Sequence, residues 1–334
     1  MKRLITIAAV VALVVATSFI FYGAIGTKST ADVRLFDFNY SFAVQNIPDD
    51  TQSIKAWVPF PANNLYQKVV DYSVNSKYPY TILTESENGN RFIQFNLSKD
   101  LENNEVDPRI SLTFRVERKS YNALDKGDDP YIATAGLDRY LSANRLVPVD
   151  GIIAEEAARV VGTTQDKLSQ ARLLYDYIVS SVTYDKSGDA WGRGDAIYAC
   201  NARTGNCTDF HSLFMGEARS LGIPARFVMG FPLPEDKSEG DVLGYHCWAE
   251  FWIKGYGWIP IDASEAHKHP EKKEMLFGGL DNNRIQFTIG RDIRIPQSKA
   301  KPANYAIYPY VEVDGQPFEN VTWDFSFENV NIAY

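Results

Sequence analysis

Cysteine is scarce in this chain of 334 residues, which contains only Cys200, Cys207 and Cys247. The sequence has neither paired C-x-x-C motifs nor an H-E-x-x-H motif, and it has no D-x-[DN]-x-[DN]-G calcium loop. A zinc site can be drawn only from Cys207, His211, His246 and Cys247, and two of these are neighbours that would point to opposite faces of a strand. We therefore expect no metal and no cofactor.

Long runs of like charge are also missing. The formal net charge is -8 and the isoelectric point is near 5.2, so the basic surface that a nucleic-acid partner requires is not expected. Internal repeats and low-complexity stretches are absent as well. The hydrophobic content of 45% and charged content of 23% indicate a globular protein of two or three domains, and the 13% of aromatic residues favours β-sheets.

The first residues differ from the rest of the chain. Lys2 and Arg3 precede residues 4–24, a stretch without a charged side chain, which is typical of a secretory signal peptide. The stretch is long enough for an N-terminal membrane anchor, so residues 1–30 are interpreted as one or the other, with a slight preference for the signal. The protein is then exported, and is periplasmic or anchored to the outer face of the cytoplasmic membrane. An odd number of cysteines in an oxidising compartment leaves at least one thiol free.

Alternating apolar residues predict strands in the first third of the chain. Residues 36–44, 93–97 and 110–116 each place apolar side chains at every second position. Residues 32–120 are therefore predicted to form an all-β sandwich domain. Residues 121–163 are interpreted as a connector, and residues 164–334 as a catalytic domain with C-terminal strands.

Two helices are predicted inside that second domain. Residues 164–182 carry one apolar helical face, with Thr164 as a candidate N-cap. A second helix runs from Cys207 to Leu221, where Asn206 can cap the start and Asp209 suits the positive end of the helix dipole. Strands are expected at residues 226–230, 245–253, 258–262, 286–293, 305–313 and 321–327.

The position of Cys207 suits a nucleophile. Unpaired N–H groups and the dipole at the start of a helix favour a thiolate over a thiol, and the same N–H groups can bind the oxyanion of a tetrahedral intermediate. Trp191 and Tyr184 are candidates for a second oxyanion donor, and either can equally be a packing residue. A buried cysteine that only fills space is the alternative for Cys207.

A hairpin supplies a base and an orienting carboxylate. Residues 254–257 reverse the chain. His246 and Asp262 are an even number of residues apart and centred near position 254, so in a tight hairpin they should fall about opposite each other with their side chains on the same face. In that arrangement the carboxylate fixes the imidazole tautomer while the imidazole activates the thiol. Alternation points Cys247 to the other face, so it is set aside, and it could pair with Cys200 in a disulfide. The other three histidines, His211, His267 and His269, lack this context and are expected at the surface or in local hydrogen bonds.

These segments resemble the transglutaminase-like superfamily, a papain-like thiol fold. The resemblance covers about residues 165–265, and the motifs are G-N-C-T-D-F (205–210), G-I-P-A-R (222–226), H-C-W-A-E (246–250) and G-W-I-P-I-D (257–262). It implies an α+β core, with the cysteine-bearing helix on an antiparallel sheet, preceded here by the all-β sandwich. It also implies a catalytic triad of Cys207, His246 and Asp262.

A triad of this kind forms a thioester with an amide carbonyl and passes the acyl group to a second nucleophile. We expect a thiol peptidase or amidase that acts on a peptide or protein substrate of the cell envelope. A protein-glutamine transglutaminase that crosslinks proteins is the first alternative, although the missing calcium loop weakens it. A binding or scaffold protein that keeps only the fold is the second.

Overall fold

The structure is a computed structural model that describes residues 33–98, 109–126 and 136–330. The predicted signal peptide or anchor at residues 1–30 lies outside the described residues. Within the described ranges, none of the helices combines the length and the hydropathy that crossing a bilayer requires. The fold is a mixture of helices and mostly antiparallel sheets, as the α+β prediction requires.

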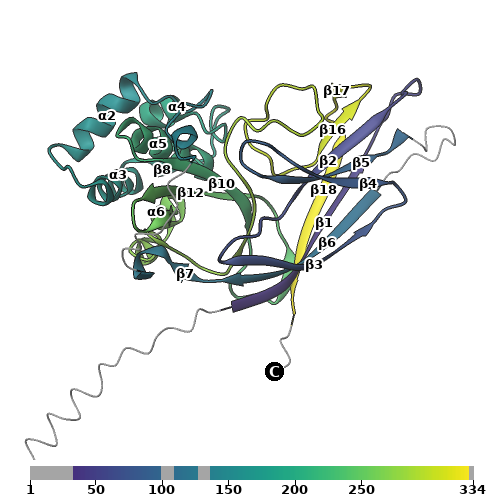
Figure 1. The fold of residues 1–334 in the computed structure, drawn as a ribbon, viewed down its shortest axis with the longest axis horizontal. Coiled ribbons are helices and arrows are strands. Elements are labelled where there is room, and N and C mark those ends of the chain that lie inside the picture. The colour runs from purple at the N-terminus through teal and green to yellow at the C-terminus, as the bar shows by residue number, and fades with distance from the viewer. Residues whose placement is uncertain (1–32, 99–108, 127–135, 331–334) are drawn as a thin grey trace, which may run out of the picture. The chain divides into compact units, whose positions relative to one another are not determined.

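Two five-stranded sheets build the sandwich (Figure 1). The first contains, in spatial order, β11 (Glu239–Asp241), β18 (Val321–Asn329), β1 (Val33–Val44), β6 (Arg109–Lys119) and β3 (Gln67–Asn75). The second contains β17 (Gln316–Pro317), β16 (Tyr310–Val313), β2 (Ile54–Phe60), β5 (Arg91–Asn96) and β4 (Tyr80–Thr84). Aromatic rings join them, because Phe42 meets Phe95 at 6.0 Å and Phe60 meets Phe114 at 5.2 Å between ring centroids.

The alternation read from the sequence explains these strands. In β1, Phe36, Phe38, Tyr40 and Phe42 are fully buried, whereas the residues between them are partly exposed. A strand that carries apolar side chains at every second position can bury one face and leave the other half-solvated. The predicted β-rich N-terminal region is therefore confirmed.

The C-terminal strands belong to the sandwich, and this corrects the predicted division of the chain. β18 pairs with β1 from Phe36↔Asn329 to Val44↔Val321, and β16 pairs with β2. The sequence placed these strands in the catalytic domain because strand patterns carry no information about which distant strand they pair with. Residues 305–309, expected at the start of β16, lie outside that strand, and β15 (Arg284–Ile289) ends earlier than predicted.

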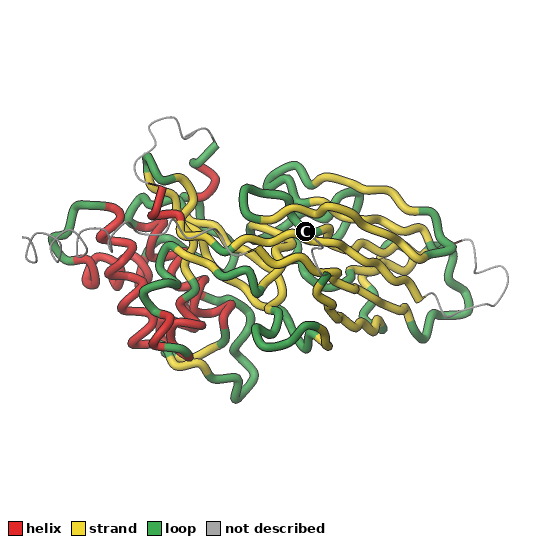
Figure 2. Tube along the Cα trace, turned by 90° about the horizontal axis from the view of Figure 1, so that it is seen from below, coloured by secondary structure: helices red, strands yellow, loops and turns green. Residues whose placement is uncertain are grey.

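The remaining part of the described chain is a four-stranded antiparallel sheet on which helices pack. Its strands are β13 (Gly257–Ile261), β12 (His246–Ile253), β10 (Ala225–Pro232) and β15, in this order. The helices are α2 (Gly151–Val161), α3 (Lys167–Ser181), α4 (Ala196–Ala202), α5 (Cys207–Ser220) and α6 (Ala263–Lys268). Helix α5 packs against β12 and β10 and is surrounded by the other four helices, so that its residues from Cys207 to Arg219 are all buried. Figure 2 shows the helices gathered in one part of the described chain, apart from most of the sandwich strands.

Short elements complete the description. They are the strand pair β7 (Tyr121–Asn122) with β14 (Gly279–Leu280), the parallel pair β8 (Thr183–Tyr184) with β9 (Thr204–Gly205), and the 3-10 turns η2 (Ala123–Lys126), η3 (Asp138–Tyr140) and η4 (Pro270–Lys272). The predicted connector contributes α2, which packs on α5 and so forms part of the helical layer. Helix α3 is capped by Asp166, whose carboxylate accepts the N–H of Ser169, and not by Thr164 as expected.

Candidate active site

The start of helix α5 is held by the cap that the sequence predicts. The Asn206 side chain accepts the N–H of Thr208 at 2.8 Å, and the Asp209 carboxylate accepts the N–H of Asn206 at 3.0 Å. This reciprocal arrangement satisfies donors that a helix start leaves unpaired. Cys207 is the first residue of the helix and is buried.

A glycine loop closes over this first turn. Asp209 also accepts N–H groups from Gly192 at 2.6 Å and Gly194 at 2.9 Å, and Arg291 donates to the Gly194 carbonyl at 3.1 Å. Gly194 has φ +62°, and a Cβ there would meet Arg291, Ser212 and Thr208 at 2.7 Å. Only glycine fits so close an approach in that conformation. Burial raises the pKa of Asp209 despite the three N–H donors that stabilise its anion.

His246 and Asp262 meet as predicted, through a different register. His246 is the first residue of β12, and its Nε2 lies 2.7 Å from Oδ2 of Asp262. The hairpin pairs Ile253 with Gly257 and Ala249 with Ile261, so its centre is residue 255 and not 254. Asp262 lies beyond the end of β13 and caps helix α6, where its Oδ1 accepts the N–H of Glu265 at 3.1 Å. The contact therefore runs diagonally from the start of one strand to the helix that follows the other.

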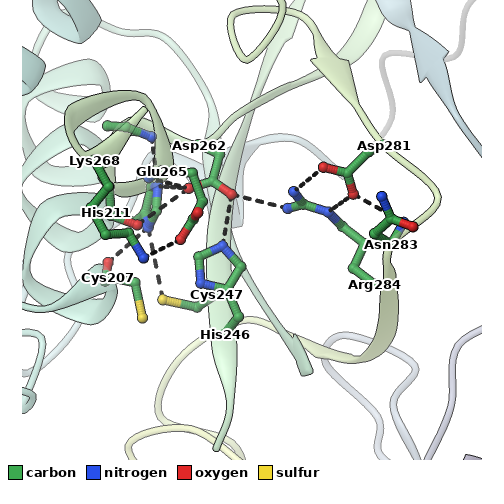
Figure 3. A network of polar contacts seen from close by, with 12 residues as sticks. Cys207, His211, His246, Cys247, Asp262, Glu265, Lys268, Asp281, Asn283 and Arg284 are labelled. Atoms are coloured by element: carbon green, nitrogen blue, oxygen red, sulfur yellow. Dashed lines mark hydrogen bonds and ion pairs between the residues drawn. The ribbon is translucent and has the colours of Figure 1, made fainter. Parts of the chain in front are cut away.

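Arg284 binds the same oxygen of the Asp262 carboxylate as His246 does, a role that sequence reasoning missed. Its Nη1 donates to Oδ2 of Asp262 at 3.0 Å, and its Nε and Nη2 bind Asp281 at 3.1 Å each (Figure 3). The guanidinium lies over the Trp248 ring, 5.2 Å from its centroid. Arg284 and Asp262 are both almost wholly buried, and a buried pair of this kind is stable only when its remaining polar atoms are also satisfied. Arg284 lies on β15, which two other strands separate from β13 in the sheet. No local sequence pattern joins it to Asp262, so only the fold reveals the contact.

His211 is buried and makes local hydrogen bonds, which agrees with one of the two roles expected for it. Its Nδ1 lies 2.7 Å from the Cys207 carbonyl, and its Nε2 accepts the N–H of Ala263 at 3.0 Å. These partners require a neutral ring with the proton on Nδ1, and burial lowers the pKa of His211 accordingly. Both ring nitrogens are occupied, so the ring that the hypothetical zinc set would use is already bonded to the backbone.

The Cys247 side chain lies against Cys207, which corrects the sequence interpretation. Its Sγ is 3.8 Å from His211 Nδ1 and 4.0 Å from Thr208 Oγ1, so it faces the first turn of α5. Alternation was correct in separating Cys247 from His246, but the face turned towards the helix is that of Cys247. His246, at the start of β12, interacts with Cys207. All three cysteines are free, so the Cys200–Cys247 disulfide is not formed.

The electrostatics of the group favour an ion pair. A hydrogen bond with Cys247 and the nearby His246, acting against burial, hold the pKa of Cys207 well below its ordinary value. Burial alone would lower the pKa of His246, but Asp262 and Cys207 raise it to about 10. Burial is likewise outweighed at Asp262, where His246 and Arg284 hold the pKa well below the usual range. Because Nε2 of His246 is bonded to Asp262, Nδ1 is the nitrogen available to Cys207.

A cleft of about 390 Å³ opens beside His246. Its lining includes Tyr184, Tyr245, Lys186, Lys268 and Arg284. Trp191 donates its indole N–H to the Gly188 carbonyl at 2.8 Å, whereas Tyr184 lines the cleft. Of the two aromatic residues considered as oxyanion donors, Tyr184 is the better placed.

Sequence comparison identifies relatives of this chain. Residues 155–263 match the sequence model of the transglutaminase-like superfamily. An uncharacterised protein of Haemophilus influenzae is 28% identical over 333 residues, which cover 86% of this chain and 88% of that protein. The Bacillus subtilis protein YebA is 24% identical over 151 residues, which cover 40% of this chain and 20% of YebA.

A solved structure extends the similarity to the sandwich. The crystal structure of a candidate cysteine protease from Cytophaga hutchinsonii superimposes with a TM-score of 0.62 at 18% identity, covering 91% of this chain and 93% of that one. At this identity the similarity concerns the fold. The family resemblance predicted from the motifs is confirmed, and residues 155–263 of this chain form a transglutaminase-like core domain.

Proposed function

We propose that the protein is a thiol enzyme that cleaves amide bonds through a thioester, with Cys207 as nucleophile, His246 as base and Asp262 as the orienting carboxylate. One observation carries the proposal. A cysteine at the capped start of a buried helix adjoins an imidazole whose other nitrogen lies 2.7 Å from a buried carboxylate. Nucleophile, base and orienting group are the three roles that such catalysis needs.

Each group has a defined step. The Cys207 thiolate attacks the amide carbonyl, and the His246 imidazolium gives its proton to the leaving amine. The N–H of Cys207 at the helix start and the Tyr184 hydroxyl are the proposed donors to the oxyanion. Asp262, held by Arg284 and by the N–H of Glu265, keeps the imidazole oriented while its charge changes.

Charge pairing at the cleft supports water as the second nucleophile. A lysine acceptor would be guided best by a carboxylate without a partner. Among the described residues that line the cleft, Glu235 is paired with Lys272, Glu265 with Lys268, and Asp281 with Arg284. We therefore favour a peptidase or amidase over a crosslinking transglutaminase.

The setting proposed for this activity is the cell envelope. It depends on Lys2, Arg3 and the uncharged residues 4–24, which are typical of an export segment. The substrate is then a peptide or protein outside the cytoplasm. The membrane attachment of the protein depends on whether this segment is cleaved.

The test supplies the full-length protein with a glutamine-bearing protein and a fluorescent amine, and follows peptide cleavage, ammonia release and amine incorporation. Cys207→Ala is the matched control. We expect cleavage or ammonia release without incorporation, and neither in the control. Ammonia is released in both reactions, so amine incorporation that accounts for most of the ammonia released would replace the hydrolase by a transglutaminase. Turnover that survives in Cys207→Ala would refute the thiol mechanism.

A further inference from the structure

A second thiol lies beside the proposed nucleophile. Cys247 is fully buried on β12, with Sγ 3.8 Å from Nδ1 of His211 and 4.0 Å from Oγ1 of Thr208. Both of those residues belong to the first turns of α5, so the Cys247 sulfur lies beside the start of the helix that begins at Cys207. Figure 3 shows the two sulfur atoms as neighbours.

The two thiols differ in character. Hydrogen bonding with Cys247, together with His246, favours the thiolate of Cys207, whereas burial and the neighbouring thiol raise the pKa of Cys247 well above its ordinary value. A thiolate next to a neutral thiol is the arrangement in which one sulfur is oxidised first and the other resolves it.

We propose that Cys207 and Cys247 form a reversible dithiol and disulfide pair, oxidised by a hydroperoxide, that blocks the site and protects its nucleophile from irreversible oxidation. The blocking role rests on the proposed function, because it requires Cys207 to be the nucleophile. The disulfide itself does not. Cys247 faces the helix, while its neighbour His246 faces the cleft. Two neighbouring residues of β12 would therefore serve two reactions, His246 the amide cleavage and Cys247 the disulfide.

The chemistry balances with the peroxide as the only added reactant. The Cys207 thiolate attacks one peroxide oxygen, an S–O bond forms, the O–O bond breaks, and the departing oxygen leaves as water after taking a proton from His246. The Cys247 sulfur then attacks the sulfenic sulfur, an S–S bond forms, the S–O bond breaks, and the hydroxyl leaves as water with the Cys247 proton. In total, two thiols and one hydrogen peroxide give one disulfide and two waters.

Cys200 provides an internal control. It lies on helix α4, where its Sγ is 3.5 Å from Oε1 of Glu156. Burial and the Glu156 carboxylate raise its pKa to about 11, so it is a poor thiolate. It should therefore take no part in the oxidation.

The experiment treats the reduced full-length protein with stoichiometric hydrogen peroxide, alkylates the remaining thiols, and maps the peptides by mass spectrometry before and after dithiothreitol. We expect the loss of two hydrogen atoms, a linked pair of peptides containing Cys207 and Cys247, and alkylation at Cys200 only. Cys200→Ala should behave identically. In Cys247→Ala and Cys247→Ser, treated with at least the two equivalents of hydrogen peroxide that this oxidation consumes, Cys207 should proceed to sulfinic acid that dithiothreitol does not reverse.

Peptide mapping does not depend on turnover, so the pair and the proposed enzyme activity can fail separately. Sulfinic acid at Cys207 in the wild type, continued alkylation of Cys247 after oxidation, or a bridge to Cys200 would each overturn the pair. A disulfide in a protein without amide activity would leave the pair intact and remove its blocking role.

Discussion

The transglutaminase-like core and the β-sandwich both have large interiors, and they fill them with different side chains. The core buries an ionic group of Asp262, Arg284 and His246, whereas Phe42 and Phe95 meet across the sandwich interior. Burying charge costs free energy unless every partner is supplied, and burying aromatic rings is favourable by itself. The buried polar network therefore costs the core folding free energy. Such a cost is expected of a site whose charged groups take part in a reaction.

The largest predicted effect is a loss of turnover that arises in the core alone, without a loss of stability. Cys207→Ala should reduce amide turnover by about 10⁴-fold or more, because the residues of such a group act as a unit. The melting temperature should change little, since alanine fills most of the same buried space. Steady-state kinetics and thermal unfolding of the same sample check this. Loss of stability without loss of turnover would make Cys207 a packing residue.

Asp262→Asn should affect both properties. Turnover should fall by about 10²- to 10⁴-fold, because an amide in place of the carboxylate of a catalytic triad leaves the histidine in the wrong tautomer and orientation. Stability should fall by about 3–5 kcal/mol at neutral pH, because Arg284 loses a charged partner. Steady-state kinetics and urea unfolding at pH 7 measure the two effects.

The stability lost in Asp262→Asn should depend on pH, and the lowered pKa of Asp262 gives the direction of that dependence. The folded pKa of Asp262 is lower than that of an unfolded aspartate, so its pairing stabilises the fold above about pH 4 and the contribution disappears as pH falls through the lowered value. Urea unfolding of wild type and Asp262→Asn should converge in acid. A stability difference that is independent of pH would contradict the charged pairing.

The sandwich should show the opposite behaviour. Phe95→Ala leaves a cavity between the two sheets and should cost about 3–5 kcal/mol of unfolding free energy. Turnover per folded molecule should stay unchanged, because Phe95 lies on β5, which pairs only with other sandwich strands. Denaturant unfolding with active-site titration measures both. A fall in turnover per folded molecule would show that the sandwich takes part in catalysis.

The smallest predicted difference lies within the core. Tyr184→Phe should reduce turnover by about 10²- to 10³-fold if the hydroxyl binds the oxyanion. Trp191→Phe is the matched control and should have little effect, since its indole donates to the Gly188 carbonyl. Equal effects of the two changes on kcat would remove Tyr184 from the oxyanion site.

The local features of both regions could be predicted from the sequence. The alternation at Phe36, Phe38 and Phe42 predicted the strand β1, and Asn206 with Asp209 predicted the start of α5. Each is a short-range pattern that one element satisfies alone. The contact between His246 and Asp262 was also predicted, although a hairpin centre displaced by one residue changed its route.

Features that join distant segments could not be predicted. The pairing of β18 with β1 and the approach of Arg284 to Asp262 depend on which strands lie together, and periodicity does not encode this. Cys247 was misplaced for a related reason. Alternation separates two neighbours on a strand, but only the packing of α5 on β12 decides which face the helix covers.

The thiolate and imidazolium pair on which the proposed function depends can be tested by alkylating Cys207 with iodoacetamide across pH, in wild type and in His246→Ala. We predict that wild-type Cys207 reacts rapidly well below the pKa of an ordinary thiol, about 8.5, and that the His246→Ala rate falls with pH as an ordinary thiol does. If Cys207 reacts in both proteins only as an ordinary thiol, with one rate profile, the thiolate and imidazolium pair does not exist.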